Sequence, residues 1–309
     1  MSWTTVSGIK IYWESCGQGE PLLLISGVSG GTWTFEESIE KWSPHYRVIV
    51  FDNMGAGRSS KPNRPCSIGE MADHAAAVLD AAEEKQANVV GLSMGGMIAQ
   101  ELTLRHPDRV HRLLLGCTHC GGSVRIPPSP EVIQKFADNT GLSPEEIIDK
   151  NLALLVMPQF QKNESDALKR YRDRQLRAPW QPDYALRRQL EAIGGFDTSK
   201  RIGNIQVPTL ILTAEYDMMV PPENGRILAN LIPGAVEKSF VNAGHLIYLE
   251  CAQDFQETVI QFFRSPHRMS SICPVFDKIC FHRQQLCALD ETSSLVKPFW
   301  QDLKRARGK

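Results

Sequence analysis

The chain has 309 residues, of which 42% are hydrophobic and 22% are charged, an ordinary globular composition with room for one large domain or two small ones. Its formal net charge of -1 gives no electrostatic basis for binding nucleic acid or an acidic membrane surface. No stretch approaches the roughly 18 apolar residues of a membrane span, and the first residues do not resemble a secretory signal. Eight cysteines in such a chain predict reduced thiols and a cytoplasmic location rather than a disulfide scaffold.

Strand-like and helix-like runs alternate along most of the chain. Residues 3–6 and 9–14 flank a Ser-Gly pair and predict a β-hairpin. Continuous apolar runs, typical of strands covered on both faces, follow at 21–26, 47–53, 87–93, 111–118 and 207–215. Helical patterns separate them at 34–42, 68–84, 96–106 and 222–232. This alternation predicts an α/β protein with a mostly parallel central sheet and helices on both faces.

The alternation stops between about Ser123 and Gly195, where the sequence has helical periodicity and no convincing strand. One helix there has a plausible N-cap at Ser143. We therefore expect a helical insertion between two strands of the sheet. The predicted core has two parts, residues 1–122 and 196–265, and a helical cap over 123–195 lies between them. Residues 266–309 form a C-terminal extension of unknown role.

The extension carries Cys273, Cys280 and Cys287 at seven-residue spacing. A docked or partly disordered tail is the simpler interpretation of this segment, because chain ends are often loose. A helix whose cysteine stripe packs on a partner is the alternative. Neither interpretation assigns chemistry to the tail.

The candidate nucleophile is Ser93 in the sequence Gly91-Leu92-Ser93-Met94-Gly95. This G-x-S-x-G pattern follows an apolar strand and precedes an amphipathic helix, which is the strand–turn–helix context that the motif requires. Glycines allow the strand and helix to approach closely, while the start of the helix supplies free N–H donors and positive potential. A structural serine would not need this arrangement.

A nucleophilic serine requires a base and an orienting acid. Of the eight histidines, His245 stands out because it follows a strand-like run and a small-residue turn, directly before the last helix. Asp217 lies in the loop after the strand at 207–215, at the edge where catalytic groups of such sheets gather. Glu215 is the alternative acid. The order serine, acid, histidine is that of α/β-hydrolases.

With this triad in place, residues from about 3 to 264 resemble an α/β-hydrolase of the small esterase and lactonase type, similar to 3-oxoadipate enol-lactonases. The matching stretches are PLLLISGVSGG, VIVFDNMGAGRSSKP, VVGLSMGGMIAQELTLRHPDRV, PTLILTAEYDMMVPPENGRILANLIPGA and NAGHLIYLE. The resemblance implies the α/β-hydrolase fold with a helical cap after the sixth strand. It also implies an oxyanion hole formed by the backbone N–H groups of Val28 and Met94.

The chain departs from the family pattern near the oxyanion hole. Ser26 precedes Gly27 where relatives usually have histidine, so the support of this loop differs. Asp52, Arg58 and Ser59, in a glycine-rich turn, are expected to brace the loop rather than contact substrate.

The cavity walls are predicted from position alone. Residues expected there are Trp33, His119, Met157 and Trp180. The Cys117-Thr-His119-Cys120 sequence invites a zinc or redox interpretation, but it lacks a second cysteine pair and follows a strand, so a place in the cleft floor is favoured. Arginines of the cap would suit an acidic substrate if they faced inward, although a solvated helix face is the simpler expectation; they are Arg174, Arg177, Arg187 and Arg188.

These residues predict a hydrolase of a small carboxylic ester or lactone, with no metal and no cofactor, acting through an acyl-enzyme. No nucleic-acid partner is expected, and a homodimer is left open. One alternative is a ligand-binding or signalling protein on the same fold with slow or vestigial hydrolysis. Another keeps the triad and changes the bond to a thioester, a carbon–carbon bond or a peptide.

Overall fold

The computed structural model describes residues 2–265, and the predictions for 266–309, including the cysteine stripe, lie outside the described residues. Eight strands form one sheet in the order β1-β2-β4-β3-β5-β6-β7-β8. The first two form the predicted antiparallel hairpin, β2 pairs antiparallel with β4, and the remaining pairings are parallel. The strands are β1 (Ser2–Val6), β2 (Ile9–Cys16), β3 (Glu20–Ile25), β4 (Tyr46–Phe51), β5 (Ala87–Leu92), β6 (Val110–Gly116), β7 (Thr209–Ala214) and β8 (Val236–Phe240).

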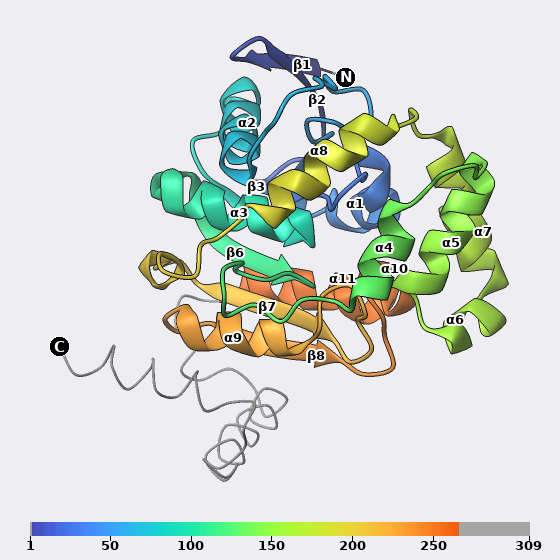
Figure 1. Cartoon of the computed structure of the whole chain (residues 1–309). Helices are drawn as coiled ribbons and strands as arrows, with labels where there is room; N and C mark the ends of the chain where they lie inside the picture. The colour runs from blue at the N-terminus through green and yellow to red at the C-terminus, as the bar shows by residue number, and fades with distance from the viewer. Residues whose placement is uncertain (1, 266–309) are drawn as a thin grey trace, which may run out of the picture. The chain divides into compact units, whose positions relative to one another are not determined.

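Helices cover both faces of this sheet. Figure 1 places α2, α3 and α9 in front of the strands and α1 and α11 behind them, and α1 packs against α11. The bounds of these helices are α1 (Glu36–Trp42), α2 (Ile68–Ala81), α3 (Met94–Arg105), α9 (Glu223–Leu231) and α11 (Ala252–Arg264). Short helices are η1 (Thr32–Phe35), η2 (Pro107–Arg109), η3 (Ile202–Asn204) and α10 (Ile247–Glu250). Among residues 2–265, no helix is both long and apolar enough to span a membrane.

The central strands are apolar because they are covered on both sides. Every residue of β5 and of β7 is buried. Side chains on one face of these strands, Val89 and Ile211 among them, join those of α2 and α3 in one large hydrophobic cluster. Because buried parallel strands tolerate little displacement, their carboxyl ends form a rigid edge on which side chains can be held in fixed positions.

A cap of five helices lies between β6 and β7, as the resemblance implies. It contains α4 (Pro130–Ala137), α5 (Pro144–Leu155), α6 (Pro158–Asn163), α7 (Ser165–Arg177) and α8 (Asp183–Gly194). The predicted N-cap Ser143 begins α5 and forms a reciprocal capping box with Glu146. Leu152 and Tyr171 of the cap share a hydrophobic cluster with Leu246 and Leu249, which follow the candidate histidine.

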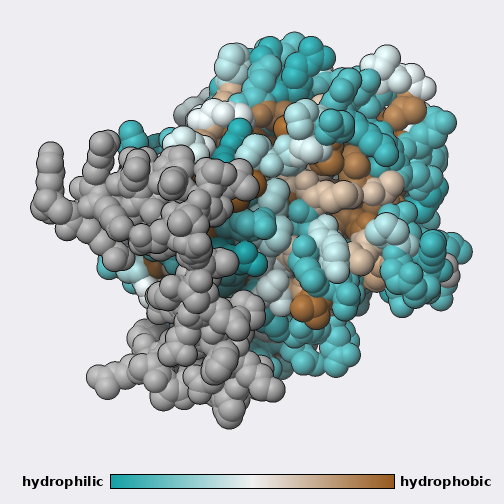
Figure 2. Space-filling model, turned by 60° about the horizontal axis from the view of Figure 1, so that its bottom comes forward, coloured by the Kyte–Doolittle hydropathy of each residue, from teal (hydrophilic) through white to brown (hydrophobic). Residues whose placement is uncertain are grey.

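The surface is mostly hydrophilic, with apolar residues gathered in one zone of the face in Figure 2. Exposed apolar side chains include Met218 after β7 and Val241 after β8. Both follow strand carboxyl ends, the edge on which the candidate site residues lie.

Candidate active site

Ser93 occupies the sharp bend between β5 and α3. Its φ of 56° and ψ of -120° are rare for a residue with a side chain and hold the hydroxyl away from both elements. A Cβ atom on Gly95 would collide with the carbonyl oxygen of Ile25, so this close approach requires glycine. The Ser93 N–H donates to Gly116 at 2.8 Å, and the Thr118 hydroxyl donates to the Ser93 carbonyl at 2.8 Å. The surrounding backbone therefore fixes the strained serine.

Asp217 and His245 form a pair at the same edge of the sheet. Asp217 is buried in the turn after β7, where its Oδ1 accepts hydrogen bonds from the N–H groups of Met219 and Val220 at 2.9 and 2.8 Å. Its Oδ2 lies 2.7 Å from Nδ1 of His245. A carboxylate facing Nδ1 favours the tautomer with its proton there, which leaves Nε2 free to accept a proton from another group.

The alternative acid, Glu215, lies at the start of the same turn. Its side chain is exposed, and its Oε2 accepts a hydrogen bond from the Asn242 N–H at 3.1 Å. Within residues 2–265, no hydrogen bond joins Glu215 to His245. Asp217 is therefore the carboxylate that the structure brings to the imidazole.

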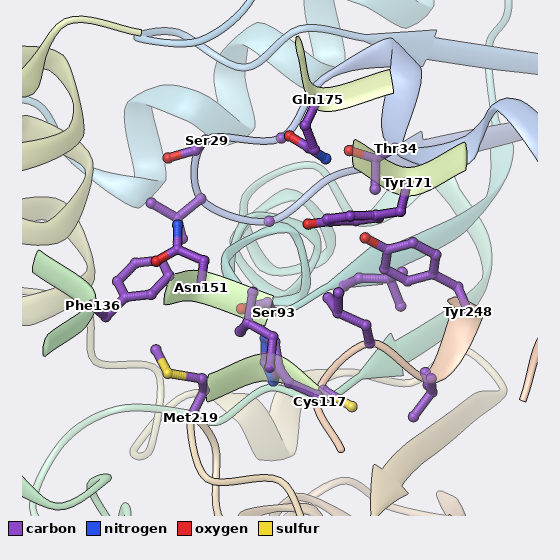
Figure 3. Close-up of a pocket in the computed structure, with 18 of the residues that line it drawn as sticks. Ser29, Thr34, Ser93, Cys117, Phe136, Asn151, Tyr171, Gln175, Met219 and Tyr248 are labelled. Carbon is purple, nitrogen blue, oxygen red and sulfur yellow. The ribbon is translucent and has the colours of Figure 1, made fainter. Parts of the chain in front are cut away.

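Ser93 and His245 line one cavity of about 140 Å³ beneath the cap. Figure 3 shows Ser93 near the middle of this cavity, with Phe136 and Met219 to one side and Tyr171 to the other. In the described part of the chain, no hydrogen bond joins the serine hydroxyl to the imidazole. Such contacts are often long before substrate binds, so the shared cavity is the informative observation.

The candidate oxyanion hole lies beside the serine. Met94 is the first residue of α3, so its N–H has no acceptor within the helix, and Val28 lines the cavity from the loop after β3. Gly27 lies so close that an added Cβ atom would be 3.7 Å from the Ser93 hydroxyl oxygen. Where relatives usually have histidine, Ser26 is fully buried, and its carbonyl accepts from Asn53 Nδ2 at 2.8 Å.

The turn after β4 supports this loop, as predicted. Asp52 is fully buried and accepts from the Thr32 N–H at 2.7 Å and from the Arg58 N–H at 2.8 Å. Ser59 donates to the Asp52 carbonyl at 2.6 Å and accepts from the Tyr12 N–H at 2.9 Å. The Thr32 contact binds the turn to the first residue of η1 and the Tyr12 contact binds it to β2, while none of these side chains lines the cavity.

Cys117 lines the cavity floor, whereas Cys120 does not. Both thiols are free and buried, and burial raises the pKa of Cys117 well above its usual range and that of Cys120 to about 11. In the described residues, Cys117, Asp217 and His245 have donor atoms within 4.8 Å of one another and could meet at a metal ion. Asp217 and His245 already bond each other, and a metal would compete with that bond.

The side chains predicted for the cavity walls lie elsewhere. Trp180 is 55% exposed, and His119 is buried with its Nδ1 accepting from the Gly121 N–H at 3.0 Å. Trp33 and Met157 are partly buried, but neither is among the lining residues. Proximity in sequence to the cap or to the oxyanion loop does not determine which way a side chain points, and this is why position alone misplaces them.

Residues that the sequence analysis did not select line the cavity instead. They come from the loop after β3, η1, α5, α7 and the segment after His245, and the polar members are Ser29, Thr34, Asn151, Tyr171, Gln175 and Tyr248. The only signal for the cap residues was their place on amphipathic helices, which does not separate a cavity wall from a helix core. Phe136 of α4 and Leu155 of α5 add apolar side chains to the wall.

Glu250 joins the cap to the loop that carries the histidine. Its Oε1 accepts from the Met157 N–H and its Oε2 from the Gly244 N–H, both at 2.8 Å. The Leu246 N–H also donates to the cap carbonyl of Leu155 at 3.2 Å. Burial raises the pKa of the Glu250 carboxyl, and the two N–H donors oppose that shift. No local pattern around Glu250 indicates this contact.

The sheet order and the serine bend at its edge define an α/β protein of the hydrolase class. Residues 20–252 match the α/β hydrolase fold family, and the chain belongs to this family.

Several similar proteins have names that denote hydrolases. Over 227 residues the chain is 34% identical to a protein of Azorhizobium caulinodans provisionally named carbamate hydrolase RutD, covering 73% of this chain and 84% of the relative. A poly(3-hydroxyalkanoate) depolymerase of Ectopseudomonas oleovorans is 28% identical, covering 82% and 88%. The solved enol-lactonase of Burkholderia xenovorans LB400 has a TM-score of 0.75 and 25% identity, covering 85% of this chain and all of that one. The resemblance stated from the sequence is confirmed.

Proposed function

We propose that the protein is a serine hydrolase of small carboxylic esters or lactones, with Ser93, His245 and Asp217 as its catalytic residues. The observation that carries the proposal is the 2.7 Å contact between His245 Nδ1 and Asp217 Oδ2. The same histidine lines one cavity together with Ser93, whose backbone is strained. The relatives' names support it, since carbamate, poly(3-hydroxyalkanoate) and enol-lactone substrates all contain an acyl carbonyl group.

In the proposed reaction, the Ser93 oxygen attacks the substrate carbonyl carbon while His245 Nε2 takes the hydroxyl proton. Asp217 stabilises the imidazolium that forms, and the N–H groups of Val28 and Met94 donate to the carbonyl oxygen as it becomes negative. The tetrahedral intermediate expels the alcohol, which receives the proton from His245. Water then attacks the acyl-serine by the same steps and releases the acid and the free serine.

The cap, proposed to span 123–195, would act as a lid that limits water near the acyl-enzyme. The cytoplasmic location and the homodimer stay predictions of the sequence.

A serine-directed fluorophosphonate tests the mechanism. We expect covalent labelling of the folded protein at Ser93, located by peptide mapping, and turnover of short esters, lactones and carbamates. Ser93→Ala should remove labelling and lower kcat by about 10⁴-fold or more. Ser239→Ala, at an exposed position on β8, serves as the matched control and should leave both unchanged. An unlabelled Ser93 in folded protein, or turnover that survives its loss, would contradict the proposal.

A further inference from the structure

The cavity wall contains no Asp, Glu, Lys or Arg side chain among the described residues. The Cys117 thiol and the two tyrosine hydroxyls of the wall are neutral near pH 7. Burial raises the pKa of Tyr171 to about 12 and that of Tyr248 well above its usual range. A charged substrate group would therefore lose its hydration without gaining an opposite charge, which is costly.

Three arginines of α7 do not supply such a charge, because they pair with carboxylates of α1 that do not line the cavity. Arg174 is buried and lies 2.5 Å from Glu37 of α1, and Arg170 bonds the same carboxylate at 3.2 Å. Arg177 pairs with Glu36 at 3.3 Å. Glu36 and Glu37 therefore already neutralise the α7 cations that an acidic substrate would need.

Two carboxamides in the cavity wall lack protein partners. Asn151 of α5 has a buried Oδ1 with no hydrogen-bond partner. Gln175 of α7 also makes no side-chain hydrogen bond to another described residue. By contrast Gln181, on the segment before α8, donates to the Gly55 carbonyl at 2.8 Å. An amide offers both donors and acceptors, and leaving the buried Asn151 Oδ1 unpaired is unfavourable unless a ligand bonds to it.

The two amides approach the cavity from different cap helices, and Figure 3 shows Asn151 on the side of Phe136 and Gln175 beside Thr34. Apolar side chains occupy much of the remaining wall, including Ile148 and Leu155. The cavity volume of about 140 Å³ is close to that of an engineered protein cavity that binds benzene. It therefore suits an acyl group of about four to six heavy atoms.

We propose that Asn151 and Gln175 are specificity-determining residues for a small, uncharged substrate that carries a hydroxyl or carbonyl group in addition to its reacting carbonyl. This inference rests on the proposed function. The second polar group would hydrogen-bond to the free carboxamides, while the hydrocarbon part contacts the apolar wall. A carboxylate in its place would meet no cation, and a methyl group would leave the amides unpaired.

Three methyl esters of similar size separate these cases: methyl 3-hydroxybutyrate, methyl 3-methylbutyrate and monomethyl succinate. Hydrolysis is followed by titration of the acid released, with kcat and KM measured for each ester. We expect kcat/KM for the hydroxy ester to exceed that for the methyl analogue by about tenfold and that for the succinate by more. The preference should fall to about twofold in Asn151→Leu and be reduced in Gln175→Leu.

Asn163→Leu is the matched control, because Asn163 is an exposed cap asparagine at the end of α6. Fluorophosphonate labelling of Ser93 in each variant verifies that the site is folded. Labelled enzyme that prefers the methyl analogue or the succinate, or that keeps its preference in Asn151→Leu, would overturn this inference and leave the proposed function intact. Folded protein that neither labels nor cleaves any ester would overturn both.

Discussion

The sheet edge and the cap contribute different kinds of polar group to the same cavity. At the edge, Asp217 is held by two backbone N–H groups and the imidazole of His245, and Ser93 is fixed by its strained backbone. In the cap, Asn151 and Gln175 reach the cavity without protein partners. The contrast indicates that the core fixes the groups proposed for bond cleavage in advance, whereas the cap leaves bonding capacity for the substrate.

The sharpest way to break this comparison is to disturb the fixed pair. Asp217→Asn should lower kcat by about 10⁴-fold, because an amide that donates to Nδ1 favours the wrong imidazole tautomer. Steady-state kinetics on any ester that the protein cleaves gives this value. Glu215→Gln is the control at the exposed acid of the same turn and should change kcat less than twofold. Equal losses in the two variants would mean that Asp217 has no special role.

The connection between core and cap comes next in size. Glu250→Ala leaves the N–H groups of Met157 and Gly244 without their acceptor, so we expect unfolding free energy to fall by about 3 kcal/mol. The kcat for ester hydrolysis should also fall by about tenfold, because the loop that carries His245 becomes less firmly held. Urea unfolding and ester kinetics measure the two effects. Glu257→Ala, at an exposed position of α11, is the control and should change neither the unfolding free energy nor kcat. If Glu250→Ala also leaves both quantities unchanged, the cap is held by apolar packing alone.

At the junction of core and cap, His119 should make stability depend on pH. Burial lowers its pKa from 6.5 to about 4, so below pH 6.5 the unfolded chain binds the proton first and the folded state loses stability down to about pH 4. His119→Asn keeps an acceptor for the Gly121 N–H and removes the titration. Between pH 7 and 5 the variant should lose about 2 kcal/mol less unfolding free energy than the natural chain. Urea unfolding of both proteins at pH 7 and pH 5 measures this difference. An equal loss of unfolding free energy in the variant and the natural chain would contradict the prediction.

The smallest effect is expected at Trp180. Its side chain is 55% exposed on the segment before α8 and does not line the cavity. Trp180→Ala should therefore change kcat/KM less than twofold and unfolding free energy by no more than about 0.5 kcal/mol. Phe136→Ala provides the contrast, since Phe136 lines the cavity and should alter substrate preference. A large change of KM in Trp180→Ala would indicate that Trp180 contacts the substrate.

The core was predictable from the sequence because the signals for its elements are local. Apolar runs of strand length, the glycines around Ser93 and the turn after β7 each leave a pattern within a few residues. The order of these motifs then places Ser93 and Asp217 at strand ends, since carboxyl ends of parallel strands share one edge. The position of Asp217 in its loop favoured it over Glu215 as the partner of His245. The contact between Asp217 and His245 is seen in the structure.

The cap follows a different rule. Its amphipathic helices, and even the capping box at Ser143, could be read from residue spacing, but their orientation depends on packing between helices that no local pattern encodes. Spacing along the chain was therefore enough to specify the sheet, its bend at Ser93 and the existence of a cap. Folding in three dimensions was needed to turn Trp180 outward, to point Asn151 and Gln175 into the cavity and to bring Glu250 between two segments, because each outcome depends on neighbours distant in sequence.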